Sequence, residues 1–342
     1  MTSSQDRPRY CIAVDAMGGD HAPGEIVRGA VDAAARGDVD VLLVGEPEAI
    51  EVSMPSPVPA TLQVVPSQGV ITEEEHPLEA LRSKPGASMV VAAGLVREGK
   101  AHAYVTMGST GAAMATGVIA LGNLEGIERP ALGGPFLGLA PKTTLVDLGG
   151  SIDSRPSQLL NHGVLGSVFA KVFLDIDNPS VALLSVGSEE GKGNRQVREA
   201  YQLFQQSSLN FIGNVEGMDV PLGKANVVVC DGFVGNILMK FAEGLGTAVV
   251  EYLRARAPNG VDRMAGELLG ELANLTNYVE HLGGGPLLGL NGVAIVGHGR
   301  SKAPSVTAAI DMACIALERN LVELMGRELA LVRMNVRDEQ EK

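Results

Sequence analysis

Glycine-rich turns with polar or charged side chains follow apolar runs at six places in the chain. Glycine lets the backbone approach a ligand closely, and a helix N-terminus offers unpaired N–H groups and the positive end of the helix dipole. Together these features favour binding of a small anion such as phosphate. One such turn carries little information, but six predict a phosphate-binding crevice. They lie at residues 15–25, 107–117, 147–156, 186–194, 230–236 and 297–305.

Four side chains in these turns are candidates for catalysis. Lys192, flanked by glycines, is predicted to bind phosphate or stabilise an oxyanion, with a solvated surface charge as the alternative. Asn236 is either an amide donor to an anion or a helix N-cap. When ionised, Asp231 can accept hydrogen bonds but cannot donate them, so it is expected to orient Lys192 or the backbone turn. His21, beside two carboxylates, is either a general acid for the leaving group or part of a pair that holds its loop.

A second group is predicted to bind phosphate through backbone N–H groups, hydroxyls or ring nitrogens. Asn194 is as easily a helix N-cap as a ligand, and His298 precedes a short cationic turn at a helix start. The predicted phosphate-binding residues are Gly18, Gly19, Ser109, Thr110, Gly111, Asn194, His298, Gly299 and Ser301.

Familiar catalytic and cofactor motifs are missing from the sequence. It contains no GxxxxGK[ST], no GxGxxG that opens a helix, no GxSxG and no HExxH, and its histidines are scattered. We therefore expect no metal and no cofactor. An anion site without an obvious protein nucleophile favours a reaction in which phosphate itself attacks, for example on an acyl thioester.

Short apolar runs that alternate with amphipathic ones must position these turns. Most runs are continuously apolar, as in strands buried on both faces, and their alternation with helices predicts a doubly wound, mostly parallel α/β sheet of the Rossmann-like type. In such sheets ligands bind at the carboxyl ends of the strands. The predicted strands are 10–16, 40–45, 61–67, 102–108, 143–150, 180–187, 210–215, 226–232 and 293–299.

The length of 342 residues predicts one large or two interleaved domains. We interpret residues 10–330 as a single α/β catalytic domain, after a flexible N-terminus at 1–9 and before a polar tail at 331–342. Within it, residues 236–282 are expected to form a projecting helical hairpin broken at 257–260, and the proline-rich stretch 46–60 a surface connection.

Composition restricts the partners and the compartment. A net charge of −13 opposes nucleic-acid binding. Three cysteines without CxxC spacing and a polar N-terminus predict a cytoplasmic protein. Arg254, Arg256 and Arg263 near the predicted hairpin tip are candidates for contact with an acidic carrier protein or the membrane surface, or are ordinary solvated arginines.

Taken in order, several of these motifs resemble the bacterial phosphate acyltransferases of the PlsX family. The resemblance extends from about residue 10 to about residue 318. It departs at Ser109 and Ser151, where the family usually has amides, which leaves a ligand role for these side chains open. The matching motifs are IAVDAMGGDHAP (12–23), VGSEEGKGN (186–194), FIGNVE (211–216), CDGFVGN (230–236), GGPLLGLN (284–291) and HGRS (298–301).

This resemblance implies transfer of a fatty acyl group from acyl carrier protein to inorganic phosphate, giving an acyl phosphate for phospholipid synthesis. It also implies a fold similar to phosphotransacetylases and isopropylmalate-dehydrogenase-like proteins, a homodimer, and peripheral attachment to the inner face of the membrane. Two alternatives stay open: a nicotinamide-dependent dehydrogenase of a related fold, and a non-catalytic phosphate- or lipid-binding regulator.

Overall fold

The computed structural model describes residues 9–256 and 263–340, which divide into two compact units. Unit 1 comprises Met1–Asn123 and Leu282–Val322, and unit 2 comprises Leu124–His281 and Glu323–Lys342. The chain thus leaves unit 1, builds most of unit 2, returns to unit 1 and ends in unit 2, which is an interleaved arrangement that its length left open. A single catalytic domain over 10–330 stays a prediction.

Unit 1 contains six hydrogen-bonded strands in the order β3-β2-β1-β4-β11-β10. All neighbouring pairs are parallel except β10 with β11. The central strand β1 has the apolar sequence YCIAVD, and its last four residues are buried, as expected for a strand covered on both faces. The strands are β1 (Tyr10–Asp15), β2 (Val39–Gly45), β3 (Leu62–Pro66), β4 (Ala103–Thr106), β10 (Gly285–Leu288) and β11 (Val293–Val296).

The helices of unit 1 pack in pairs on these strands. α1 packs against α11, and α4 packs against α5. The first pair is very close at Gly29, where an added Cβ would overlap the carbonyl oxygen of Ala303. The helices are α1 (Gly24–Ala35), α2 (Pro47–Ser53), α3 (Pro77–Ser83), α4 (Ser88–Arg97), α5 (Thr110–Leu121) and α11 (Ala303–Glu318).

Unit 2 contains five hydrogen-bonded strands in the order β5-β6-β9-β7-β8. Only the β5–β6 pair is antiparallel. Its core includes Leu145, Ala182 and Val228 from three adjacent strands, together with Cys230. The strands are β5 (Ala131–Gly134), β6 (Thr144–Val146), β7 (Ser180–Leu184), β8 (Asn210–Val215) and β9 (Val227–Val229).

Helix α6 is the most buried helix segment of unit 2 and packs against β5, β6, β7 and β9. The short helix η1 (Gly217–Asp219) follows β8. The other helices are α6 (Pro156–Phe173), α7 (Arg195–Gln205), α8 (Gly232–Ala255), α9 (Arg263–Thr276), α10 (Tyr278–His281) and α12 (Leu321–Gln340), which begins in unit 1.

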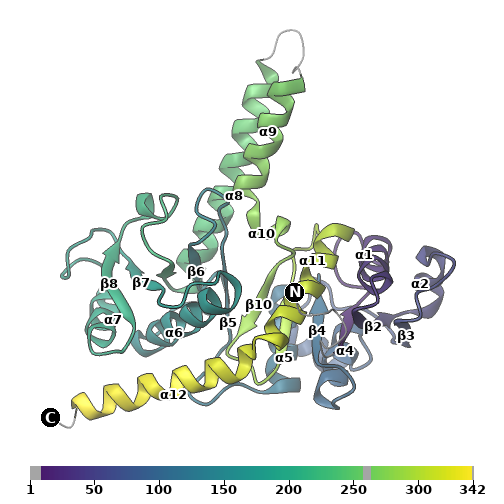
Figure 1. The fold of residues 1–342 in the computed structure, drawn as a ribbon, viewed down its shortest axis with the longest axis horizontal. Helices are drawn as coiled ribbons and strands as arrows, with labels where there is room; N and C mark the ends of the chain where they lie inside the picture. Colours follow the sequence, from purple (N-terminus) through teal and green to yellow (C-terminus); the bar gives the residue numbers. More distant parts are fainter. Residues whose placement is uncertain (1–8, 257–262, 341–342) are drawn as a thin grey trace, which may run out of the picture. The chain divides into compact units, whose positions relative to one another are not determined.

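The predicted helical hairpin corresponds to α8 and α9, which lie side by side and extend away from the strands of unit 2 (Figure 1). The helices are closest at Gly246, where an added Cβ would overlap the Thr276 side chain. By length and composition alone α8 is able to cross a membrane, although here it packs along α9. The predicted break at 257–260 lies outside the described residues.

The predicted fold class is confirmed, since each of the nine predicted strands overlaps an observed one. Strands β5 and β10 were not predicted, and residues 46–60 are not a plain connection. They contain the short helix α2, which Pro47 begins and the buried Ile50 anchors. The predicted polar tail continues as the end of α12 to Gln340. The predicted flexible N-terminus lies, except for Arg9, outside the described residues.

Candidate active site

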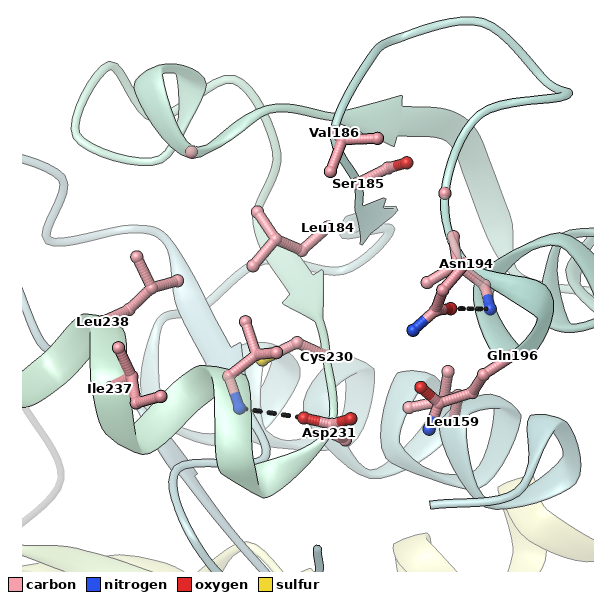
Figure 2. A pocket seen from close by; sticks show the side chains of 14 residues that line it. Leu159, Leu184, Ser185, Val186, Asn194, Gln196, Cys230, Asp231, Ile237 and Leu238 are labelled. Carbon is pink, nitrogen blue, oxygen red and sulfur yellow. Dashed lines mark hydrogen bonds between the residues drawn. The ribbon is translucent and has the colours of Figure 1, made fainter. Parts of the chain in front are cut away.

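A candidate site in unit 2 is a cavity of about 380 Å³ at the carboxyl ends of β7 and β9. Its walls come from α6, the turn after β7, the start of α7, η1 and the start of α8 (Figure 2). Of the predicted site residues, Asn194 and Asp231 line it. The cavity thus lies where the topology of a parallel sheet places ligands.

Both of these residues are helix N-caps. Asn194 Oδ1 accepts a hydrogen bond of 2.9 Å from the N–H of Val197 at the start of α7. Asp231 Oδ1 accepts one of 2.8 Å from the N–H of Val234 at the start of α8. Capping leaves the Asn194 amide nitrogen facing the cavity (Figure 2). Asp231 therefore orients a backbone turn, one of the two roles expected for it.

Cys230 lines the cavity as a buried thiol. Burial raises the pKa of this thiol well above its usual value, and the charges of Asp147 and Asp231 raise it further. A thiol in this environment stays protonated near neutral pH, and only the thiolate is a good nucleophile. The geometry therefore favours a reaction without an acyl-cysteine intermediate.

Asp147, which the sequence analysis did not select, organises the turn after β6. Its carboxylate accepts backbone N–H bonds from Leu132 at 3.0 Å, Gly149 at 3.1 Å, Gly150 at 2.9 Å and Ser151 at 2.7 Å. The carbonyl of Ser151 then accepts a bond of 2.8 Å from the N–H of Gly232. One buried carboxylate thus fixes the glycine turn against the start of α8. An aspartate at a strand end, two residues before Gly-Gly, was the available signal.

His162 of α6 supports the same region from the core. Its ring hydrogen-bonds to the backbone of Cys230, and burial lowers its pKa below the usual value, although the nearby Asp147 and Asp231 charges oppose this shift. The ring is therefore neutral near neutral pH. Its Nδ1 atom is buried without a hydrogen-bond partner in the part of the chain that the structure describes.

Lys192 and Asn236 lie near the cavity but do not line it. Lys192 is exposed, and its stem lies over Gly187, where an added Cβ would be 3.0 Å from Lys192 Cγ. Asn236 is exposed in the first turns of α8 and packs beside Gly149 of the Asp147 turn. Because Asp231 is the N-cap of α8, the interpretation of Asn236 as an N-cap is wrong.

Unit 1 holds a second, smaller cavity of about 220 Å³ at the carboxyl ends of β1, β4 and β11. Three of the predicted phosphate-binding residues line it together: Gly19, Ser109 and Gly299. The turns meet through a bond of 2.7 Å from the N–H of Asp20 to the carbonyl of Gly299. Ser109 caps α5 by accepting a weak bond of 3.4 Å from the N–H of Ala112.

Asp15 holds the turn after β1 at the edge of this cavity, in the same way that Asp147 holds the turn after β6. It is fully buried and accepts bonds from the Thr106 hydroxyl at 2.7 Å and the N–H of Met17 at 3.1 Å. Burial raises the pKa of Asp15, and these hydrogen bonds partly offset that rise. Gly18 packs on Gly108 so closely that an added Cβ would be 2.9 Å from its nitrogen. Glycine is therefore required where these two turns cross.

The other predicted residues of unit 1 border these turns without lining the cavity. His21 and Gly111 are exposed, and Thr110 begins α5. His298 accepts a bond of 3.2 Å from the N–H of Arg300 through Nδ1. Ser301 is fully buried, and its hydroxyl has no hydrogen-bond partner in the described structure.

The predicted arginine group is only partly described. Arg254 and Arg256 are exposed in the last turns of α8, and the Arg256 guanidinium lies 3.8 Å from the centre of the Tyr252 ring. The side chain of Arg263 lies outside the described part of the structure. Among the residues that are described, no group of three or more His, Cys, Asp or Glu side chains is placed to hold a metal ion.

The fold is that of the phosphotransacylases. A phosphotransacetylase from Streptococcus pyogenes superposes with a TM-score of 0.59 at 18% identity, covering 92% of this chain and 94% of that one. A branched-chain phosphotransacylase from Enterococcus faecalis gives a TM-score of 0.52 at 15% identity, covering 90% and 98%. Identities this low define the fold class alone.

Sequence comparison identifies the family within that fold. The chain belongs to the fatty acid synthesis protein family, whose sequence model matches residues 10–324. A phosphate acyltransferase from Desulfitobacterium hafniense is 43% identical over 325 residues, covering 93% of this chain and 97% of that protein. One from Thermosynechococcus vestitus is 45% identical over 327 residues, covering 93% and 95%. The family resemblance drawn from the motifs is confirmed.

Proposed function

We propose that the chain is an acyltransferase that moves a fatty acyl group from acyl carrier protein to inorganic phosphate, giving an acyl phosphate for phospholipid synthesis. The observation that carries this proposal is the near full-length identity of 43% and 45% to proteins named phosphate acyltransferase. Those relatives favour it over the nicotinamide-dependent dehydrogenase. The carrier protein as acyl donor follows from the resemblance of the motifs.

In this reaction a phosphate oxygen attacks the carbonyl carbon of the acyl thioester. The new C–O bond forms, the C–S bond breaks, and the carrier sulfur leaves as a thiolate that then takes up a proton. Phosphate is largely a dianion near neutral pH, so it needs orientation and charge neutralisation more than a strong base. The protonated Cys230, which burial keeps from ionising, supports this direct attack.

Lys192 and Asn236 are the proposed donors to phosphate or to the oxyanion that develops on the carbonyl. Asp231 holds the turn that precedes Asn236, and His21 is the proposed acid for the leaving sulfur. The predicted phosphate ligands are Gly18, Gly19, Ser109, Thr110, Gly111, Asn194, His298, Gly299 and Ser301.

We also propose a homodimer, with the protein in the cytoplasm and peripheral to the membrane. Helix α8 supports an interface because it exposes large apolar side chains, among them Phe233 at 56%, Phe241 at 65% and Tyr252 at 55%. A run of exposed apolar side chains along one helix is typical of an interaction surface. The exposed Arg254 and Arg256 at its end are suited to anionic headgroups or an acidic carrier protein.

The direct test is formation of acyl phosphate from palmitoyl carrier protein and phosphate by the purified protein, trapped with hydroxylamine. If Lys192 stabilises the oxyanion, Lys192→Ala lowers turnover by roughly 10²-fold or more. Lys142→Ala, which removes another exposed lysine of unit 2, is the control and keeps full activity. Near-wild-type turnover of Lys192→Ala would remove Lys192 from the mechanism.

Two other outcomes separate the remaining alternatives. Binding of phosphate without any acyl phosphate formed would indicate the non-catalytic regulator. A rise in melting temperature with a nicotinamide dinucleotide but not with phosphate would indicate the dehydrogenase.

A further inference from the structure

The cavity of unit 2 combines an apolar interior with a polar side, which is unusual for a site that handles only phosphate. Most of its wall is formed by aliphatic side chains from three helices and a strand end. Its volume of about 380 Å³ is in the range of small-molecule pockets. The aliphatic residues are Leu159, Leu184, Val197, Val234, Ile237 and Leu238.

Three of the residues around this cavity expose apolar side chains to water. Val186 is 81% exposed, Ile237 51% and Val234 37%. Val186 lies in the glycine-rich turn after β7, where the fold does not require an apolar side chain. Single exposed apolar residues are common, but three lining the same concave surface indicate an apolar ligand.

Two polar side chains, those of Asn194 and Gln196, lie on one side of the cavity, and Asp231 lies between the two sides (Figure 2). Asn194 presents its amide nitrogen from one side, while Ile237 and Leu238 lie on the opposite side (Figure 2). Next to Asn194, the Ser185 hydroxyl is buried beside the Gly193 turn without a hydrogen-bond partner in the described structure. A ligand that fits this division has a hydrocarbon part and one polar end that accepts hydrogen bonds.

We infer that this cavity binds the hydrocarbon chain of the acyl donor. The hydrocarbon chain lies against Leu184, Ile237 and Leu238, and the thioester carbonyl at its end points toward Asn194. This inference rests on the proposed function, whose substrate has both of these parts in one molecule.

The absence of tryptophan from the chain makes a direct test practical. Ile237→Trp introduces a single fluorophore at the cavity wall, and Val52→Trp, at a position 88% exposed in α2 of unit 1, is the matched control. Each variant is mixed, without phosphate, with stearoyl or 9,10-dibromostearoyl carrier protein. Bromine quenches tryptophan only at short range. We expect severalfold stronger quenching by the brominated donor in Ile237→Trp and no difference between donors in Val52→Trp.

A second measurement follows chain-length preference. Because the larger side chain fills part of the cavity, the ratio of kcat/KM for stearoyl over octanoyl carrier protein falls by roughly tenfold in Ile237→Trp and is unchanged in Val52→Trp. Three outcomes in Ile237→Trp would overturn the acyl site. They are equal fluorescence with both donors, an unchanged ratio of kcat/KM for the two chain lengths, and a change of oligomeric state as the only effect. Acyl phosphate formation by the wild type is measured in parallel. If the wild type forms acyl phosphate although the acyl site is overturned, the proposed function still stands. If the wild type forms no acyl phosphate, both the proposed function and the acyl site are overturned.

Discussion

Two buried aspartates have the same role in the two units. Asp15 ends β1 and Asp147 follows β6, and each carboxylate accepts backbone N–H bonds from the glycine turn that comes next. A buried carboxylate is costly unless several donors satisfy it. Each aspartate therefore fixes a turn in which glycine alone fits, and the fixed turn presents its backbone at the carboxyl edge of the sheet.

Cys230 allows a residue-scale test of the direct attack by phosphate. Since burial holds its pKa well above the usual value, we expect Cys230→Ala to keep most of the wild-type turnover. Loss of the buried sulfur costs stability on the order of 1 kcal/mol, which thermal unfolding measures separately. A folded but inactive variant would point instead to a covalent acyl-enzyme.

Residue type and spacing predicted some of these roles and left others open. Asn194 was correctly given helix capping as one option, because an asparagine before a helix satisfies its first N–H groups. Nothing local distinguishes Lys192 from a surface lysine, because its surroundings depend on how the turn after β7 folds. Asp147 was missed because its function is to bind its own backbone, including the distant Leu132.

At the scale of elements, the nine predicted strands were found because most of them are continuously apolar and have glycine at or shortly after their end. β5 (ALGG) and β10 (GPLL) are four residues each and contain glycine or proline, so no periodicity can develop. Both are the antiparallel members of their part of the sheet. Their pairing depends on contacts distant in sequence, which a local pattern does not contain.

The contact between α8 and the Asp147 turn leaves no room for a side chain at Gly235. A Cβ added at Gly235 would overlap the carbonyl oxygen of Asp147, which is backbone and cannot move aside. We expect Gly235→Ala to lower the free energy of unfolding by about 1–3 kcal/mol or more and to reduce turnover, because the turn beside Asn236 shifts.

Gly244→Ala, on the same helix, is the matched control. An added Cβ there meets nothing within 4 Å, and alanine is favoured over glycine in a helix by roughly 0.5–1 kcal/mol. Denaturant unfolding should therefore show Gly244→Ala slightly stabilised. Equal stability of the two variants would mean that α8 is not held against the turn as described.

At the scale of the whole molecule, the charge distribution limits how the donor arrives. The chain carries a net charge of −13, which repels an acidic carrier protein on average, so productive docking requires a local cationic surface. Arg254 and Arg256 form such a surface at the end of α8, and Tyr252 holds the Arg256 guanidinium in place. In contrast, phosphate is a small ion that responds to the field within its own site.

Because docking of the carrier protein depends on this cationic surface and phosphate binding does not, we expect charge reversal at the arginines to change the KM for the carrier protein and not the KM for phosphate. Arg254→Glu with Arg256→Glu should raise the KM for palmitoyl carrier protein severalfold, leave the KM for phosphate unchanged, and weaken the dependence of the carrier KM on ionic strength. Arg82→Glu with Arg97→Glu makes the same change in net charge at exposed positions of α3 and α4. If that control raises the carrier KM equally, the overall charge governs docking and the arginines of α8 have no specific role.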